Sequence, residues 1–143
     1  MIRRERRREA GTGLAGMLTL FALLFCAGSP ASAEWVRAGG THKYDGYVDM
    51  ATIAPTGQRV TLWTLKDFKV IRQIPKGPYH SMAVKKQFDC RAGKGRLLQT
   101  KYYMEQMGKG RAFFTTQGTR QWSRVIPGSD GETEWKIACQ IAS

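Results

Sequence analysis

The chain has 143 residues, with 23 Lys and Arg against 11 Asp and Glu, which gives a net charge of +12 at pH 7 and an isoelectric point near 10.1. A chain of this length accommodates one domain with a modest core beside a targeting segment, and it excludes a two-domain architecture. The sequence contains no low-complexity segment and no internal repeat.

The first 33 residues have the three parts of a secretory signal peptide. Five arginines at 3–8 form a cationic beginning, an apolar run occupies 14–27, and Ala-Ser-Ala at 31–33 has the small residues that signal peptidase requires. The apolar run is too short for a transmembrane helix, which needs about 20 residues. We therefore predict that residues 1–33 are cleaved. Residues 34–143 then form one exported domain without a transmembrane segment. We expect it in the periplasm or in the outer cell envelope or surface of a Gram-negative-type bacterium.

The charge of the exported part bears on its partners. Residues 34–143 keep 18 Lys and Arg and 9 Asp and Glu, a net charge of +9. An exported protein rarely meets nucleic acid, so this charge favours anionic lipids, sulfated glycans or acidic protein surfaces. The basic residues are scattered from Arg37 to Lys136, and only Lys85 and Lys86 are adjacent. This distribution favours a diffuse solvated surface over a dedicated basic patch.

Three cysteines are present, and two remain after cleavage. Cys26 follows Phe25, whereas a lipid-anchored cysteine follows a small residue, so we expect no lipid anchor. Cys90 and Cys139 form an even pair, which predicts one disulfide in an oxidising compartment. Closing a loop of about 50 residues contributes roughly 4 kcal/mol in the chain-entropy model. Free thiols for catalysis or metal binding are the alternative, but the chain has no Cys-x-x-Cys motif and only two histidines.

Most of the exported part is typical of strands separated by Gly and Pro turns. We expect strands at 35–37, 43–49, 59–68, 81–90, 96–104, 112–115 and 122–126. A helical turn or corner is expected at 50–53 and a turn-rich segment at 75–78. The strand at 59–68 is apolar on both faces, which indicates a central strand that is covered on both sides. The strands at 81–90 and 96–104 form a predicted hairpin, and Lys86 departs from the apolar pattern of the first.

The C-terminus has the pattern of a helix. Ser129 and Glu132 have the spacing of a capping box, in which their side chains satisfy free amides of the first turn. An apolar stripe follows at Trp135, Ala138, Cys139 and Ala142. Since Cys139 is in the stripe, the disulfide would pin the helix to the sheet. We therefore predict an α+β fold: one antiparallel sheet of about five to seven strands, with the C-terminal helix packed on one face and held by the disulfide.

The order and spacing of several segments resemble the surface-adhesin protein E family of small exported bacterial proteins. The segments are 47–49 with 52–53, 60–68, Ser81 with 88–90, 97–103, Trp122 with 126–129, and 135–139. The resemblance covers nearly all of residues 34–143. It implies an antiparallel sheet with a disulfide-linked helix. The namesake of the family is a surface lipoprotein adhesin that binds host matrix and plasma proteins, binds haem and forms dimers, whereas most relatives are exported proteins of undetermined role. This sequence departs from the namesake in its signal, for which we expect no lipid anchor.

Few side chains are candidates for chemistry. Ser81 is next to His80, but adjacent strand residues point to opposite faces, and no Gly-x-Ser-x-Gly motif occurs, so we predict that the protein is not an enzyme. The candidate ligand-binding residues are His42 and His80, for a metal or haem iron, and Tyr102 and Tyr103, for a binding face. For each of them a turn, hydrogen-bonding or sheet-packing role is the competing interpretation, and no metal site is predicted.

We therefore expect a non-enzymatic envelope protein that acts by binding. The most specific form of this hypothesis is adhesion to host or envelope proteins, or to an anionic surface. A periplasmic protein that binds a small ligand such as haem, and an envelope structural or assembly factor, are the alternatives. The partner itself does not follow from the sequence.

Overall fold

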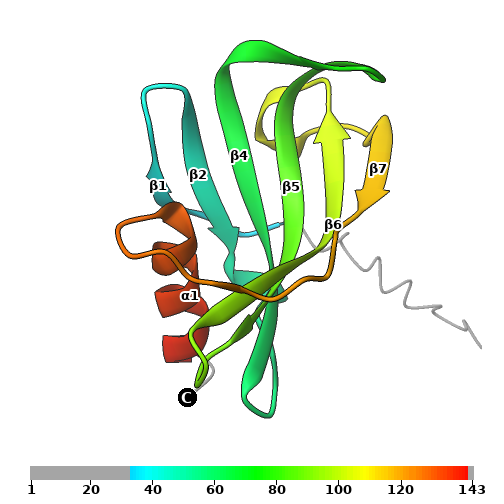
Figure 1. Ribbon diagram of the computed structural model, residues 1–143. Coiled ribbons are helices and arrows are strands. Elements are labelled where there is room, and N and C mark those ends of the chain that lie inside the picture. Colours follow the sequence, from blue (N-terminus) through cyan, green and yellow to red (C-terminus); the bar gives the residue numbers. More distant parts are fainter. Residues whose placement is uncertain (1–32, 142–143) are drawn as a thin grey trace, which may run out of the picture. The chain divides into compact units, whose positions relative to one another are not determined.

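The computed structural model describes residues 33–141, which form one antiparallel sheet and one α-helix (Figure 1). The sheet has the order β1-β2-β4-β5-β6-β7, and the short strands β3 and β8 pair with β4 and β6. The elements are β1 (Trp35–Gly40), β2 (Tyr44–Asp49), η1 (Met50–Thr52), β3 (Ala54–Thr56), β4 (Arg59–Ile74), β5 (Gly77–Asp89), β6 (Lys94–Tyr103), η2 (Gln106–Gly108), β7 (Phe114–Gln117), β8 (Ser123–Arg124) and α1 (Asp130–Ile141). The predicted α+β fold is confirmed.

The predicted signal peptide, residues 1–33, lies outside the described residues except for Ala33, so its cleavage stays a prediction. Cys26 lies outside them as well. Within residues 33–141, no helix is long and apolar enough to cross a membrane.

The β4–β5 hairpin is longer than its sequence predicts. β4 continues to Ile74 instead of ending at residue 68, and β5 begins at Gly77, inside the expected turn segment 75–78. Pro78 is tolerated because it lies close to the first residue of its strand. The register shifts between Asp67 and Arg72 of β4, and the far end of the hairpin bends across the upper end of the sheet (Figure 1).

The core lies between α1 and one face of the sheet. Its buried cluster consists of Val48, Val60, Leu62, Phe88 and Ala138. The Cys90–Cys139 disulfide joins the end of β5 to α1, with the two Cα atoms 5.6 Å apart. Strand alternation explains the composition of the cluster, because each of its β-strand members points to the same face of the sheet. The predicted pinning of the helix is therefore confirmed.

The start of α1 is capped much as its sequence predicts. The Glu132 amide donates to Ser129 Oγ at 3.3 Å, whereas the Glu132 carboxylate accepts from the Gly128 amide at 3.1 Å, one residue before the expected donor. Of the predicted stripe, Trp135, Ala138 and Cys139 pack at the core. The fourth member, Ala142, lies outside the described residues.

The opposite face of β4 is covered by η2. Leu65 is buried beside Gly108, and the Ser81 hydroxyl donates to the Glu105 carbonyl at 2.6 Å and accepts from the Gly108 amide at 2.9 Å. Asp67 accepts from the Met107 amide at 2.8 Å. The predicted coverage of the central strand on both sides therefore comes from α1 on one face and from η2 on the other.

Candidate binding face

Five aromatic rings form a row across the sheet, one from each of five neighbouring strands. We call Tyr44, Phe68, Tyr79, Tyr102 and Phe114 the aromatic row. The distances between successive ring centroids are 5.7, 5.5, 5.0 and 5.8 Å, within the range of favourable aromatic pairs. Tyr44 pairs directly with Phe68, and Tyr102 with Phe114, so cross-strand register explains these contacts.

The aromatic row lies on the same face of the sheet as α1. Tyr44 and Val48 are an even number of residues apart on β2, as are Phe68 and Leu62 on β4, and side chains at such spacings share a face. Val48 and Leu62 belong to the core under α1. The helix covers the lower end of this face in Figure 1 and leaves the upper end, where the aromatic row lies, without a helix above it.

Three cations lie over the rings of the aromatic row. Lys66 Nζ is 4.3 Å from the centroid of Tyr44, Arg72 Cζ is 5.8 Å from that of Phe68, and Lys76 Nζ is 5.9 Å from that of Phe114. Within the described part of the chain, none of the three cations makes an ion pair. Their charges are therefore held against aromatic rings and are not compensated by carboxylates.

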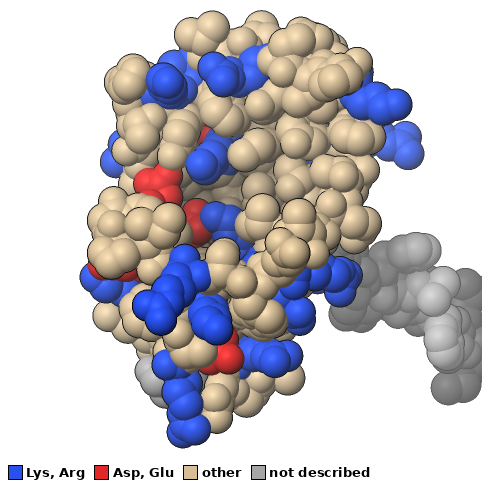
Figure 2. All heavy atoms as spheres, viewed as in Figure 1, with Lys and Arg blue, Asp and Glu red and all other residues tan. Residues whose placement is uncertain are grey.

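A hollow of about 410 Å³ lies between the aromatic row and the start of α1. It is lined by Thr41, Tyr44, Lys66, Lys86 and residues 128–131. Figure 2 shows Lys and Arg atoms on the upper part of this face and Asp or Glu atoms near its centre. Its walls come from four segments that are far apart in the sequence, and they carry lysine, tyrosine and aspartate side chains.

Tyr44 connects the aromatic row to α1. Its hydroxyl donates to a carboxylate oxygen of Asp130. This hydrogen bond, together with burial, raises the pKa of Tyr44 from 10.0 to about 12. The carboxylate favours the protonated hydroxyl, because ionisation would remove the donor and place two negative charges in contact.

Tyr44→Phe tests this hydrogen bond through its pH dependence. A folded-state pKa above the unfolded value stabilises the fold fully below about pH 10, and this contribution is lost as the pH rises through about 12. In an absorbance titration at 295 nm we expect the wild type to contain a tyrosine that ionises near pH 12 and the variant to lack it. Identical titration curves for the two proteins would contradict the assignment.

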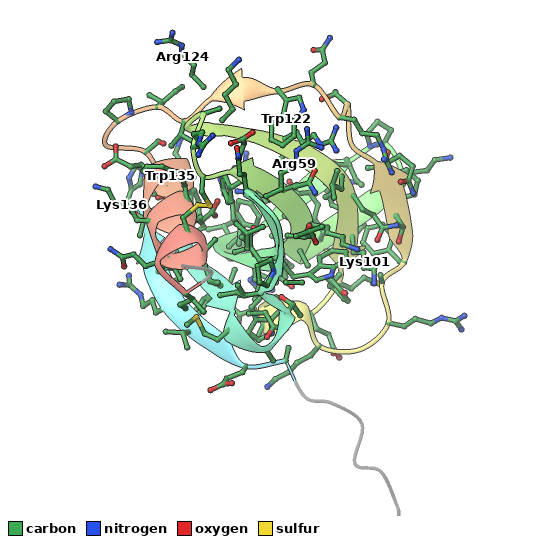
Figure 3. All side chains as sticks on the ribbon, turned by 90° about the horizontal axis from the view of Figure 1, so that it is seen from below. Arg59, Lys101, Trp122, Arg124, Trp135 and Lys136 are labelled. Atoms are coloured by element: carbon green, nitrogen blue, oxygen red, sulfur yellow. A yellow bond between two sulfur atoms is a disulfide. The ribbon has the colours of Figure 1, made fainter. Side chains whose placement is uncertain are left out.

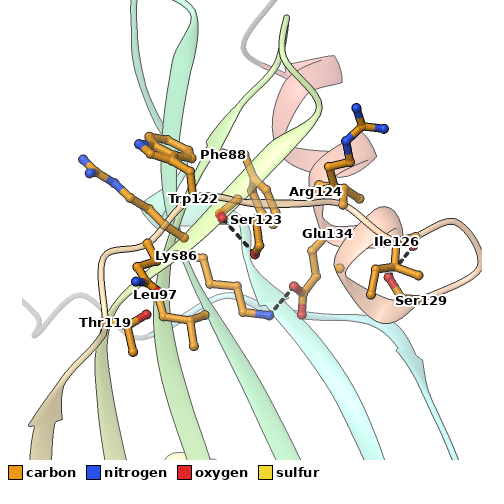
Figure 4. Close-up of a pocket in the computed structure, with 15 residues that line it drawn as sticks. Lys86, Phe88, Leu97, Thr119, Trp122, Ser123, Arg124, Ile126, Ser129 and Glu134 are labelled. Atoms are coloured by element: carbon orange, nitrogen blue, oxygen red, sulfur yellow. Dashed lines mark hydrogen bonds and ion pairs between the residues drawn. The ribbon is translucent and has the colours of Figure 1, made fainter.

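A second cavity, of about 350 Å³, lies under the segment that joins β7 to α1 (Figure 4). The apolar side chains that line this cavity include Phe88, Leu97, Trp122 and Ile126. Two guanidinium groups lie over the ring of Trp122, with the Cζ atoms of Arg59 and Arg96 at 5.2 and 4.5 Å from its centroid. Figure 3 shows Arg59 beside Trp122, whereas Arg124 points away from the fold.

One side chain that lines both cavities belongs to a largely buried ion pair. Lys86 of β5 pairs with Glu134 of α1, and their side chains are only 15% and 8% exposed. Lys86 lines both cavities, and the close-up shows its amine directed at the Glu134 carboxylate (Figure 4). The departure of Lys86 from the apolar pattern of its strand was the one sequence signal of this pair. Nothing in the sequence identified Glu134 as its partner.

The four predicted ligand-binding residues do not form one site. Tyr102 belongs to the aromatic row, whereas its neighbour Tyr103 lies beside Gly108 of η2, where burial raises its pKa. His42 is exposed in the turn between β1 and β2. His80 lies half-buried on β5, and its Nε2 has no hydrogen-bond partner in the described structure. Neither histidine lines either cavity.

The described residues also contain no group of three or more His, Cys, Asp or Glu side chains that could hold a metal ion. Sequence reasoning did not single out Lys66, Phe68, Tyr79 or Phe114, because only the strand pairing brings these residues together.

The comparison with known families identifies the chain. The model of the family described as surface-adhesin protein E matches residues 35–140. The chain belongs to the surface-adhesin protein E family. The family is one of bacterial surface adhesins, consistent with an exported, non-enzymatic binding protein. A search of curated proteins finds no match.

Solved structures of Haemophilus influenzae protein E share the fold. One has a TM-score of 0.60 at 16% sequence identity, covering 79% of this chain and 89% of the other. A second crystal form has a TM-score of 0.59 at 17% identity, covering 79% and 92%. A structure of protein E from non-typeable Haemophilus influenzae has a TM-score of 0.51 at 18% identity, and the match covers 78% of this chain and 80% of the other. At these identities the likeness concerns the fold alone.

Proposed function

We propose that this protein is an adhesin-type binding protein of the bacterial envelope and that the aromatic row, with its three cations, binds an acidic protein partner. The observation that carries the proposal is that Lys66, Arg72 and Lys76 lie over rings of the aromatic row and make no ion pair among residues 33–141. Family membership supports the general class of function.

The chemistry of this face suits acidic side chains. Each cation contacts a ring with one side and can contact a carboxylate of the partner with the other. Half-buried tyrosines offer apolar ring surface and a hydroxyl together, a combination that is enriched in protein interfaces. Three of the basic residues that are scattered in the sequence thus meet over the aromatic row.

The haem-type alternative has less support from the geometry. It depends on His42 and His80, and neither histidine lines either of the two cavities described above. The proposal therefore rests on the aromatic row and not on the histidines.

Binding to immobilised extracellular matrix proteins, with poly-L-glutamate as a defined acidic probe, tests the proposal. We expect Lys66→Gln combined with Lys76→Gln to weaken binding about five- to tenfold at 0.15 M salt, because exposed charge pairs contribute about 0.2–1 kcal/mol each. Lys109→Gln combined with Arg111→Gln is the matched control, since both of its residues are exposed and lie in the loop that follows η2.

Equal weakening by the two double variants would mean that binding follows net charge alone. Complete loss of wild-type binding at about 0.5 M salt would have the same meaning, because screening at that ionic strength acts within a few ångströms. Either result would overturn the role of the aromatic row.

A further inference from the structure

The bend of the β4–β5 hairpin exposes two adjacent apolar side chains. Val70 and Ile71 are 72% and 59% exposed. Asp67 pairs with Ser81 and Arg72 with Tyr79, so four residues of β4 lie opposite a single residue of β5. The bulge carries Val70 and Ile71 beyond the regular ladder, where neither α1 nor η2 covers them. We call residues 69–72 the crest.

The surroundings of the crest are basic. Residues 68–80 contain Lys69, Arg72 and Lys76 and no acidic residue. The Lys69 amide donates to the Lys43 carbonyl at 2.9 Å, so a further lysine from the β1–β2 turn lies next to the crest. Lys69 itself pairs with Asp45, whereas Lys43 and Arg72 make no ion pair among residues 33–141.

We propose that the crest docks on an anionic phospholipid bilayer, with Val70 and Ile71 entering the interface and Lys43 and Arg72 contacting lipid phosphates. Exposed apolar side chains beside uncompensated cations are the combination that binds anionic membrane surfaces. An acidic protein partner would match the cations but would give the two branched aliphatic side chains no apolar environment. This inference goes beyond the proposed function, because Val70, Ile71 and Lys43 lie outside the aromatic row and only Arg72 is shared with it.

Such docking would also orient the protein. The crest lies at the upper end of the sheet, opposite the end that α1 and the disulfide occupy (Figure 1). The face that carries the aromatic row would then stand beside the bilayer and stay open to a partner, so that lipid and protein could be bound together.

Vesicle co-sedimentation at 0.1 M salt tests the proposal with the exported protein. We expect binding to vesicles of 30% phosphatidylglycerol in phosphatidylcholine and no binding to pure phosphatidylcholine. Val70→Ser combined with Ile71→Ser should lower the partition coefficient at least tenfold. Lys43→Gln combined with Arg72→Gln should lower it about 25-fold, since each cation at an anionic surface contributes a factor of about five.

Two control variants match the changes in apolar surface and in charge. Val36→Ser combined with Met104→Ser removes two exposed apolar side chains elsewhere, and Lys109→Gln combined with Arg111→Gln removes two charges elsewhere. Both should partition within about twofold of the wild type. All the substituted positions are exposed, so we expect melting temperatures close to that of the wild type.

Three results would overturn the proposal. The first is no wild-type binding to the anionic vesicles. The second is full binding by the Val70 and Ile71 variant, which would indicate charge attraction alone. The third is a concentration-dependent dimer in analytical ultracentrifugation that this variant abolishes while no vesicle binding occurs, which would assign the crest to a second copy of the chain. Failure of the matrix-protein experiment leaves the vesicle result unaffected, because the Lys66 and Lys76 variant keeps the crest intact.

Discussion

Cys139→Ser is expected to lower the free energy of unfolding by about 4 kcal/mol and the melting temperature by roughly 15 °C. The disulfide joins residues separated by 49 positions, so its loss restores much conformational freedom to the unfolded chain. It also frees α1, which has 12 residues and is too short to be stable alone in water. Thermal unfolding followed by circular dichroism measures the effect.

The matching controls are Cys90→Ser, the double serine variant and the reduced wild type. All three should melt close to the Cys139→Ser protein, because each lacks the same covalent link. A melting temperature that stays within about 2 °C of the oxidised wild type would show that packing of Trp135 and Ala138 alone holds the helix on the sheet.

Glu134→Gln is expected to destabilise the fold by about 3–5 kcal/mol, because it leaves the Lys86 ammonium buried without a countercharge. Both side chains are largely removed from solvent. The pair also joins α1 to β5, and Lys86 lines both cavities. Chemical denaturation of the wild type and the variant, fitted with one shared m-value, measures the change in the free energy of unfolding.

Lys86→Met combined with Glu134→Leu removes both charges. It therefore distinguishes the free-energy cost of one unpaired buried charge from the effect of losing the ion pair itself. We expect this double variant to be within about 1 kcal/mol of the wild type, or more stable, since apolar side chains of similar volume replace buried ion pairs well. Glu132→Gln, which removes the exposed pair with Lys136, should cost less than about 1 kcal/mol. An equally small effect of Glu134→Gln would show that water reaches the Lys86 ammonium.

Local patterns in the sequence predicted the elements well where one face of the element is apolar. The period of two at 59–68 and the helical stripe from Trp135 to Cys139 both correspond to observed elements, because side-chain alternation and the helical repeat are properties of the local chain. The hairpin extension to Ile74 was not predicted. Residues 69–73 are exposed, so no burial pattern marks them as a strand.

The disulfide that holds the helix on the sheet followed from the sequence by itself, because it needs only an even pair of cysteines and an apolar stripe that contains one of them. The same applies to the family, which depends on the order of short segments. The aromatic row, the Lys86–Glu134 pair and the crest were decided by the tertiary structure alone. The row takes one ring from each of five strands, the pair joins residues 48 positions apart, and the crest arises from a register shift. Such contacts depend on strand pairing across long sequence separations, which no local periodicity records.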